Sequence, residues 1–169
     1  MEKTYSLAEL NQMDQAAFTE ALGAVFEDTP AIAHQAWYQR PFPTAESLHH
    51  CMIEIVQSMP LADQLTLIRA HPDLGSRVQM ADASVQEQTS VGLDRLTPEE
   101  HACFLSLNQN YRTKFGFPFI MAVAGQSKKQ ILTAFAERLD HAQSTEIRQA
   151  LQEIGKIAWF RLKAWISEP

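Results

Sequence analysis

The sequence predicts an all-α protein, a single-domain bundle of about eight helices that spans residues 1–169. Three observations support this prediction. Apolar residues recur at spacings of three and four along most of the chain. Capping residues, several of them followed by proline or glutamate, mark successive helix starts. Alternating runs of β-branched residues, which are typical of strands, are missing from the sequence.

The first half of the chain contains four predicted helices, each opened by a capping residue or a proline. Their starts are at Ser6 (with Glu9 three residues later), at Thr29-Pro30, at Thr44 and at Pro60. The apolar face of the first continues to Val25, so we expect one unbroken helix there. The fourth ends near His71, because Pro72 disfavours the helical conformation for the residue before it.

The second half contains four more predicted helices. They begin at Ser84 (with Glu87 in a possible capping box), at Thr97 (where Pro98 and Glu100 repeat the pattern), at Ser127 and at Thr145. Gly92 and Gly116 are placed to end the first two. The last carries its apolar residues along one stripe as far as Ile166.

Composition and charge limit the class of protein. The formal net charge is −6 at pH 7, so broad attraction to nucleic acid or to an anionic membrane is disfavoured. Cys51 and Cys103 stand singly, which predicts free thiols rather than a disulfide framework or a zinc site. The sequence shows neither a signal-peptide pattern nor a long apolar run. We therefore expect a cytoplasmic protein with no nucleic-acid or membrane partner.

Functional residues are often found where regular structure is interrupted, and residues 69–75 (RAHPDLG) form the first such interruption. They place His71 at the end of a helix, and an imidazole in general can exchange a proton near neutral pH. On this motif alone, a helix-capping role for His71 is favoured over proton transfer. Asp73 is typical of a turn.

Two further interruptions carry hydrogen-bonding groups. At Ser84–Gln88, free N–H groups of a helix start could bind an anion, although a structural capping box is the favoured alternative. Glu87 and Gln88 could accept from and donate to an amide-rich ligand. Residues 119–123 follow Gly116 and Pro118, and an extended backbone there could pair with a planar ring. The alternative is a connector that fills the core.

Arg161 lies in an apolar patch of the last predicted helix. A guanidinium there can bind a carboxylate through two hydrogen bonds, although pairing with a structural acid is commoner. The other histidines show no metal-binding spacing such as HExxH: His34, His49, His50, His101 and His141. No metal site is predicted.

Taken in order, these motifs form a longer pattern. It consists of His71–Gly75 (HPDLG), Ser84, Glu87-Gln88, Gly92-Leu93, Leu107-Asn108, Tyr111, Lys114–Ile120 (KFGFPFI), Glu153-Ile154, Ile157-Ala158 and Arg161-Leu162. This pattern resembles the 2-oxo-4-hydroxy-4-carboxy-5-ureidoimidazoline (OHCU) decarboxylase family. The likeness covers about residues 7–166, and the FGFPF stretch is its most specific part. The interval between His71 and Glu87 is shorter than in animal members of the family.

The resemblance implies an all-helical homodimer that converts this ureidoimidazoline to (S)-allantoin in urate breakdown, with neither metal nor organic cofactor. It implies catalytic roles for His71, Glu87 and Arg161. It also implies a substrate pocket lined by Pro72, Ser84, Val85, Gln86, Glu87, Gln88, Phe119, Ile120, Met121, Ala122 and Val123. Independence from a cofactor suits the chemistry, because a ring carbonyl or imine of the substrate can take up the electrons left by carbon dioxide.

Two other classes of function are compatible with single motifs. A helical binding module could use residues 117–119 for docking, without turnover. A hydrolase of a related cyclic ureide would need an activated water, and the sequence offers neither a clear metal triad nor a Ser-His-Asp arrangement. Release of carbon dioxide separates the decarboxylase from both.

Overall fold

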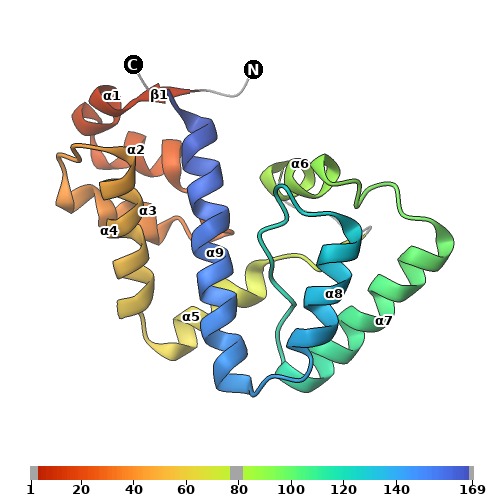
Figure 1. Cartoon of the computed structure of the whole chain (residues 1–169). Coiled ribbons are helices and arrows are strands. Elements are labelled where there is room, and N and C mark those ends of the chain that lie inside the picture. Colours follow the sequence, from red (N-terminus) through yellow and green to blue (C-terminus); the bar gives the residue numbers. More distant parts are fainter. Residues whose placement is uncertain (1–3, 77–81, 168–169) are drawn as a thin grey trace. The chain divides into compact units, whose positions relative to one another are not determined.

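The computed structural model describes residues 4–76 and 82–167. Helices dominate these ranges, which confirms the predicted all-α class (Figure 1). The α-helices are α1 (Leu7–Gln12), α2 (Gln15–Leu22), α3 (Ala31–Ala36), α4 (Ala45–Ser58), α5 (Leu61–Ala70), α6 (Asp82–Ser90), α7 (Pro98–Phe115), α8 (Lys128–Arg138) and α9 (Gln143–Trp165). A 3-10 turn (Trp37–Gln39) follows α3. Two short strands, β1 (Tyr5–Ser6) and β2 (Ile166–Ser167), pair in parallel.

Capping boxes open four of these helices, and the sequence predicted two of them, at Ser6 and Thr97. Ser6, Thr44, Thr97 and Ser127 each accept a hydrogen bond from the backbone N–H three residues ahead. In each case the side chain three residues ahead accepts a hydrogen bond from the backbone N–H of the cap. Gly116 ends α7 with a φ of 76°, the left-handed conformation that favours glycine.

Two local predictions were wrong. The single helix expected from Ser6 to Val25 is two helices, because the Asp14 side chain accepts a hydrogen bond from the Ala17 N–H and caps α2. Ser84 is not a cap, because α6 already includes Asp82. The shortened interval before Glu87 includes residues 77–81, which lie outside the described residues.

The chain forms two compact units, each with its own apolar core. The first comprises Met1–Leu67 and Gly155–Pro169, and the second comprises Ile68–Ile154. The core of the first includes Leu10, Phe18, Leu22, Ile32, Leu48, Met52 and Leu162. The core of the second includes Phe104, Tyr111, Phe117, Phe119, Ile131, Phe135 and Ile154. Helix α9 contributes residues to both units.

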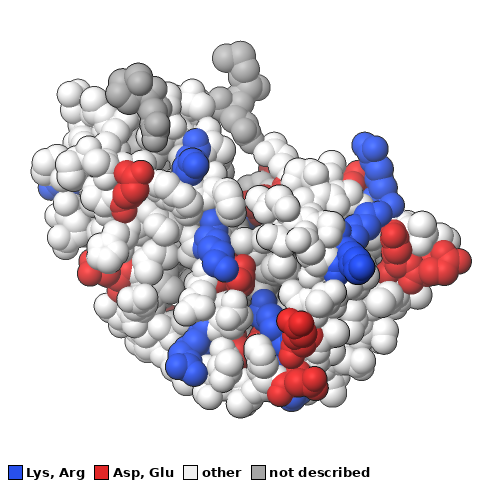
Figure 2. Space-filling model, in the orientation of Figure 1, with Lys and Arg blue, Asp and Glu red and all other residues white. Residues whose placement is uncertain are grey.

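The surface of the described residues carries charges of both signs. Lysine and arginine side chains lie interspersed with aspartate and glutamate on the face drawn in Figure 2. Within the described ranges, no helix combines the length and the apolar character needed to cross a membrane. In the same ranges, no three His, Cys, Asp or Glu side chains lie close enough together to hold a metal ion.

Candidate active site

His71 follows α5 directly, at the helix end that the sequence predicted. Its backbone N–H donates to the Ile68 carbonyl at 3.2 Å, and the residue is only 6% exposed. The imidazole is therefore largely shielded from water. Pro72, the next residue, is half-buried. The structure therefore places a buried titratable side chain beside a turn.

The turn after His71 is attached to α6 through Gln88. The side-chain oxygen of Gln88 accepts from the Gly75 N–H at 2.9 Å, and its amide nitrogen donates to the Asp73 carbonyl at 3.4 Å. Gly75 has a φ of 69°, and a Cβ added there would lie 2.8 Å from a methyl group of Leu96. The sequence predicted that Gln88 binds substrate, and these contacts give it a second role in shaping the turn.

Helix α7 holds the same turn from another direction. The side-chain amide of Asn108 donates to the Leu74 carbonyl at 2.9 Å. Arg112 donates through its Nε to the Asp73 carboxylate at 2.8 Å. Asp73 is therefore a turn residue, as predicted, and its side chain pairs with a cation. Contacts from α6 and α7 together fix the backbone that follows His71.

Helix α6 distributes its predicted substrate contacts over different faces. Ser84 and Gln88 lie one turn apart and are both buried, so they share the covered face of the helix. Val85 and Gln86 are exposed, and Glu87 is half-buried. The helical spacing alone explains this division, since residues four apart share a face and adjacent residues do not.

Residues 119–123 connect α7 to α8 without helical structure, as the sequence predicted. Four of the five are buried and Met121 is half-buried. The Phe119 ring stacks on Phe135, with ring centres 3.8 Å apart, and meets the Tyr111 ring edge-on at 5.4 Å. The side chains of this stretch therefore fill the core, which was one of the two alternatives. Its backbone is not part of a helix, and its pairing with a planar ring stays a prediction.

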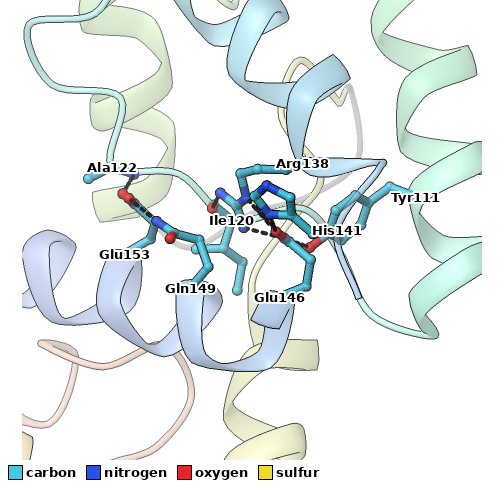
Figure 3. Close-up of polar contacts among 8 residues, drawn as sticks. All are labelled: Tyr111, Ile120, Ala122, Arg138, His141, Glu146, Gln149 and Glu153. Atoms are coloured by element: carbon cyan, nitrogen blue, oxygen red, sulfur yellow. Dashed lines mark hydrogen bonds and ion pairs between the residues drawn. The ribbon is translucent and has the colours of Figure 1, made fainter. Parts of the chain in front are cut away.

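Sequence reasoning missed a polar network around Glu146, which is fully buried near the start of α9 (Figure 3). Arg138 at the end of α8 donates to its carboxylate through Nε at 2.9 Å, and Nη2 of the same arginine lies 2.8 Å from it. His141 Nδ1 lies 2.8 Å from the other carboxylate oxygen. The Tyr111 hydroxyl also donates to Glu146.

The network changes the acidity of two of its members. Burial would raise the pKa of Glu146, but hydrogen bonds from Arg138, Tyr111 and His141 outweigh burial and lower that pKa below its usual range. Burial, together with the hydrogen bond to Glu146, raises the pKa of Tyr111 far above that of an ordinary tyrosine. The pair is thus a neutral phenol that donates to a carboxylate.

The raised pKa of Tyr111 predicts a loss of stability in alkali. Above about pH 10, tyrosine in the unfolded chain releases its proton while native Tyr111 keeps it. The folded state then binds more protons, so the free energy of unfolding falls by about 1.4 kcal/mol per pH unit. Guanidinium unfolding from pH 9 to 11 should show this slope in the wild type and a shallower one in Tyr111→Phe. The exposed Tyr38→Phe is the control, and equal slopes in all three proteins would contradict the assignment.

The signals of this network in the sequence were ambiguous. Arg138 lies in the last turn of α8 and Glu146 in the first turn of α9. Charges of these signs at these helix ends are commonplace, because they complement the helix dipole. Nothing in their spacing indicates that both side chains are buried and meet.

Arg161 belongs to the first unit, where it is 4% exposed. Its Nη2 lies 2.9 Å from the Glu27 carboxylate, and its Nη1 donates to the Ala24 carbonyl at 3.1 Å. These contacts match the structural pairing that the sequence left open as an alternative. The catalytic role of Arg161 stays a prediction.

The helical fold defines a small all-α protein, and its candidate site residues include a buried histidine and a non-helical segment where helices end. The family model described as OHCU decarboxylase matches residues 11–163. The chain belongs to the OHCU decarboxylase family.

The relatives of the chain agree with this assignment. It is 45% identical to the 2-oxo-4-hydroxy-4-carboxy-5-ureidoimidazoline decarboxylase of Halalkalicoccus jeotgali, over 94% of this chain and 90% of the relative. It is 42% identical to the protein of the same name from Haloferax volcanii, over 93% and 94% of the two chains. A crystal structure of (S)-allantoin synthase superimposes with a TM-score of 0.79 at 30% identity. That match covers 96% of this chain and 54% of the solved one, so the chain spans about half of that protein.

Proposed function

We propose that this protein decarboxylates 2-oxo-4-hydroxy-4-carboxy-5-ureidoimidazoline to (S)-allantoin, a step of urate breakdown. The observation that carries the proposal is the 45% identity with a decarboxylase of this name across nearly the whole chain. The family match over residues 11–163 includes every predicted catalytic and substrate-binding position.

The reaction breaks one carbon–carbon bond and forms one carbon–hydrogen bond. Carbon dioxide leaves, and its bonding electrons remain on the former carboxyl-bearing carbon, where the adjacent ring carbonyl or imine delocalises them. A proton then adds to that carbon. The protein has to orient the ring, stabilise the developing charge and deliver the proton to one face. Because the substrate itself delocalises the electrons, we propose that no cofactor takes part.

His71 is the proposed general acid and base, since an imidazole can take up and release a proton near neutral pH. It first contacts the substrate hydroxyl or carboxylate and then controls protonation. Glu87, half-buried on α6, holds the ureido N–H groups. Arg161 engages anionic or carbonyl oxygens of the substrate.

The backbone of residues 119–123 fixes the plane of the ring. Among the described residues, the backbone amides of Phe119 and Met121 donate to no protein acceptor. Buried amides normally have a hydrogen-bond partner, and a planar substrate with carbonyl oxygens would supply one. Pro72, Ser84, Val85, Gln86 and Gln88 line the remainder of the proposed pocket.

Circular dichroism tests the activity directly. The protein is added to substrate freshly made from urate by a urate oxidase and a hydroxyisourate hydrolase. Uncatalysed decay gives racemic allantoin, so a fast protein-dependent rise of the (S)-allantoin signal is the expected result. A trace equal to the uncatalysed one, from folded protein, would overturn the proposal in favour of a binding module.

A chelator tests the proposed independence from metal. After dialysis against EDTA, we expect the rate of (S)-allantoin formation to stay within twofold of the untreated protein. A lost rate that returns on adding a divalent cation would show that the reaction needs a metal. Release of carbon dioxide, followed in the same samples, distinguishes decarboxylation from ring hydrolysis.

We also propose a cytoplasmic homodimer, as the family resemblance implies. Size-exclusion chromatography with light scattering should give twice the 19.1 kDa mass of the chain. A mass equal to one chain would contradict the dimer. Fractionation of cells that make the protein tests its location.

A further inference from the structure

We propose that Glu153 and Arg138 are positioning residues for catalysis, which hold the backbone of residues 119–123 in the orientation that meets the substrate. The proposal rests on the proposed function, because it assigns these side chains a part in the same site. Neither residue needs to touch the substrate. Each acts through a backbone group of the segment.

Glu153 holds the segment from α9 (Figure 3). One of its carboxylate oxygens accepts from the Ala122 N–H at 2.9 Å. The other accepts from the Gln149 side-chain amide at 3.0 Å, which orients the carboxylate. Glu153 is only 6% exposed, so these hydrogen bonds are formed away from bulk water. A hydrogen bond to a charged acceptor in such surroundings is stronger than one between neutral groups.

Arg138 holds the segment from α8. Its Nη1 donates to the Ile120 carbonyl at 2.6 Å, and its guanidinium carbon lies 4.3 Å from the centre of the Phe119 ring. The other side of the guanidinium pairs with Glu146. Glu146 therefore holds the guanidinium of Arg138 in place, and the guanidinium in turn holds the Ile120 carbonyl. A guanidinium suits this task because its donors lie in one rigid plane.

Both clamps act on alternate residues of the segment. In an extended chain, the backbone groups of residues two apart point to the same edge, and those of the residue between them point to the opposite edge. The Ile120 carbonyl and the Ala122 N–H are both bound by the protein. The Met121 amide donates to no acceptor among the described residues. We infer that the segment is extended, so that the clamps hold one edge and leave the Met121 amide on the other edge, open to the substrate.

The Glu153 clamp is tested by a pair of variants. Glu153→Ala removes the acceptor for the Ala122 N–H, whereas Glu153→Gln keeps a carbonyl oxygen that can accept from it. A displacement of about 1 Å can lower a rate by about 100-fold. We therefore expect kcat to fall by about 10- to 100-fold in Glu153→Ala and to stay within about threefold in Glu153→Gln. Gln152→Ala, exposed on the same helix, is the matched control.

The enantiomeric purity of the product separates positioning from folding. The concentration of each variant is raised until its rate equals that of the wild type, so that uncatalysed decay contributes equally. A variant that is only partly folded then still gives the same enantiomeric purity as the wild type. A displaced segment gives a mixture, because the ring no longer presents one face to the proton. We expect a mixture from Glu153→Ala and (S)-allantoin from Glu153→Gln.

The Arg138 clamp needs a double variant, because Arg138→Met alone leaves the Glu146 carboxylate buried without its cation. Arg138→Met with Glu146→Gln removes both charges and keeps an acceptor for the Tyr111 hydroxyl. We expect a folded protein with a kcat lowered by about 10- to 100-fold and a mixture of enantiomers. The adjacent exposed Glu137→Ala is the control and should match the wild type.

The outcomes separate the two proposals. No turnover by the wild type would overturn the proposed function, and the positioning roles with it. Turnover by the wild type, with full rate and pure (S)-allantoin from Glu153→Ala and from the double variant, would overturn the positioning roles alone. A lower rate with unchanged enantiomeric purity would show that these residues only support folding.

Discussion

We expect His71→Ala to lower kcat for decarboxylation by about 10²- to 10⁴-fold, the usual contribution of a positioned acid or base. KM should change only a few-fold, because the substrate keeps its other contacts. The rate is measured by circular dichroism on freshly generated substrate, with far-ultraviolet spectra to show that the variant is folded. His50→Ala, whose side chain is 76% exposed, is the control and should keep full activity.

A second substitution identifies what His71 contributes. Asparagine can form hydrogen bonds similar to those of a neutral imidazole, but it cannot take up or release a proton near pH 7. His71→Asn should therefore be as slow as His71→Ala. Full activity in the folded asparagine variant would remove the acid and base assignment and leave a hydrogen-bonding role. Full activity in both variants would place the reaction elsewhere in the protein.

Glu146→Gln should cause the largest loss of stability, about 3–5 kcal/mol in the free energy of unfolding. The carboxylate is fully buried and pairs with Arg138, which is 7% exposed. The substitution keeps the shape of the side chain but leaves the guanidinium buried without a counter-charge. Guanidinium chloride unfolding at pH 7 measures the effect as a lower midpoint.

Two further variants test whether the cost comes from the unpaired charge. Adding Arg138→Met to Glu146→Gln removes that charge, so the double variant should lose less stability than the sum of the single ones. Glu54→Gln breaks the exposed pair with His50 and should cost less than about 1 kcal/mol. An unchanged midpoint in Glu146→Gln would contradict the inference that the buried pair stabilises the second unit.

The low pKa of Glu146 also gives the sign of its acid dependence. A carboxyl whose pKa is lowered on folding stabilises the protein above its unfolded pKa, and this stabilisation is lost as the pH falls through the folded value. The contribution of Glu146 is therefore fully present at neutral pH. The stability of the Glu146 variants is therefore compared at pH 7.

The sequence predicted helix starts and ends correctly where these depend only on residues a few positions apart. The capping boxes at Ser6 and Thr97 were predicted because their hydrogen bonds join residues three apart. The break at His71-Pro72 was predicted because proline restricts the residue before it. The prediction was wrong at Asp14, because the apolar residues keep a helical spacing across it although Asp14 caps a new helix.

Helical spacing and caps in the sequence were enough to predict the all-α class, and the ordered motifs were enough to predict the family. The same motifs singled out His71, Glu87 and residues 119–123, because each lies in a short continuous stretch of sequence. Only the tertiary structure showed that Gln88 binds the turn after His71, and that Glu153 and Arg138 bind the backbone of residues 120 and 122. These contacts join residues 13 to 31 positions apart. Whether such side chains meet depends on how helices pack, and no local pattern of charge or spacing specifies that packing.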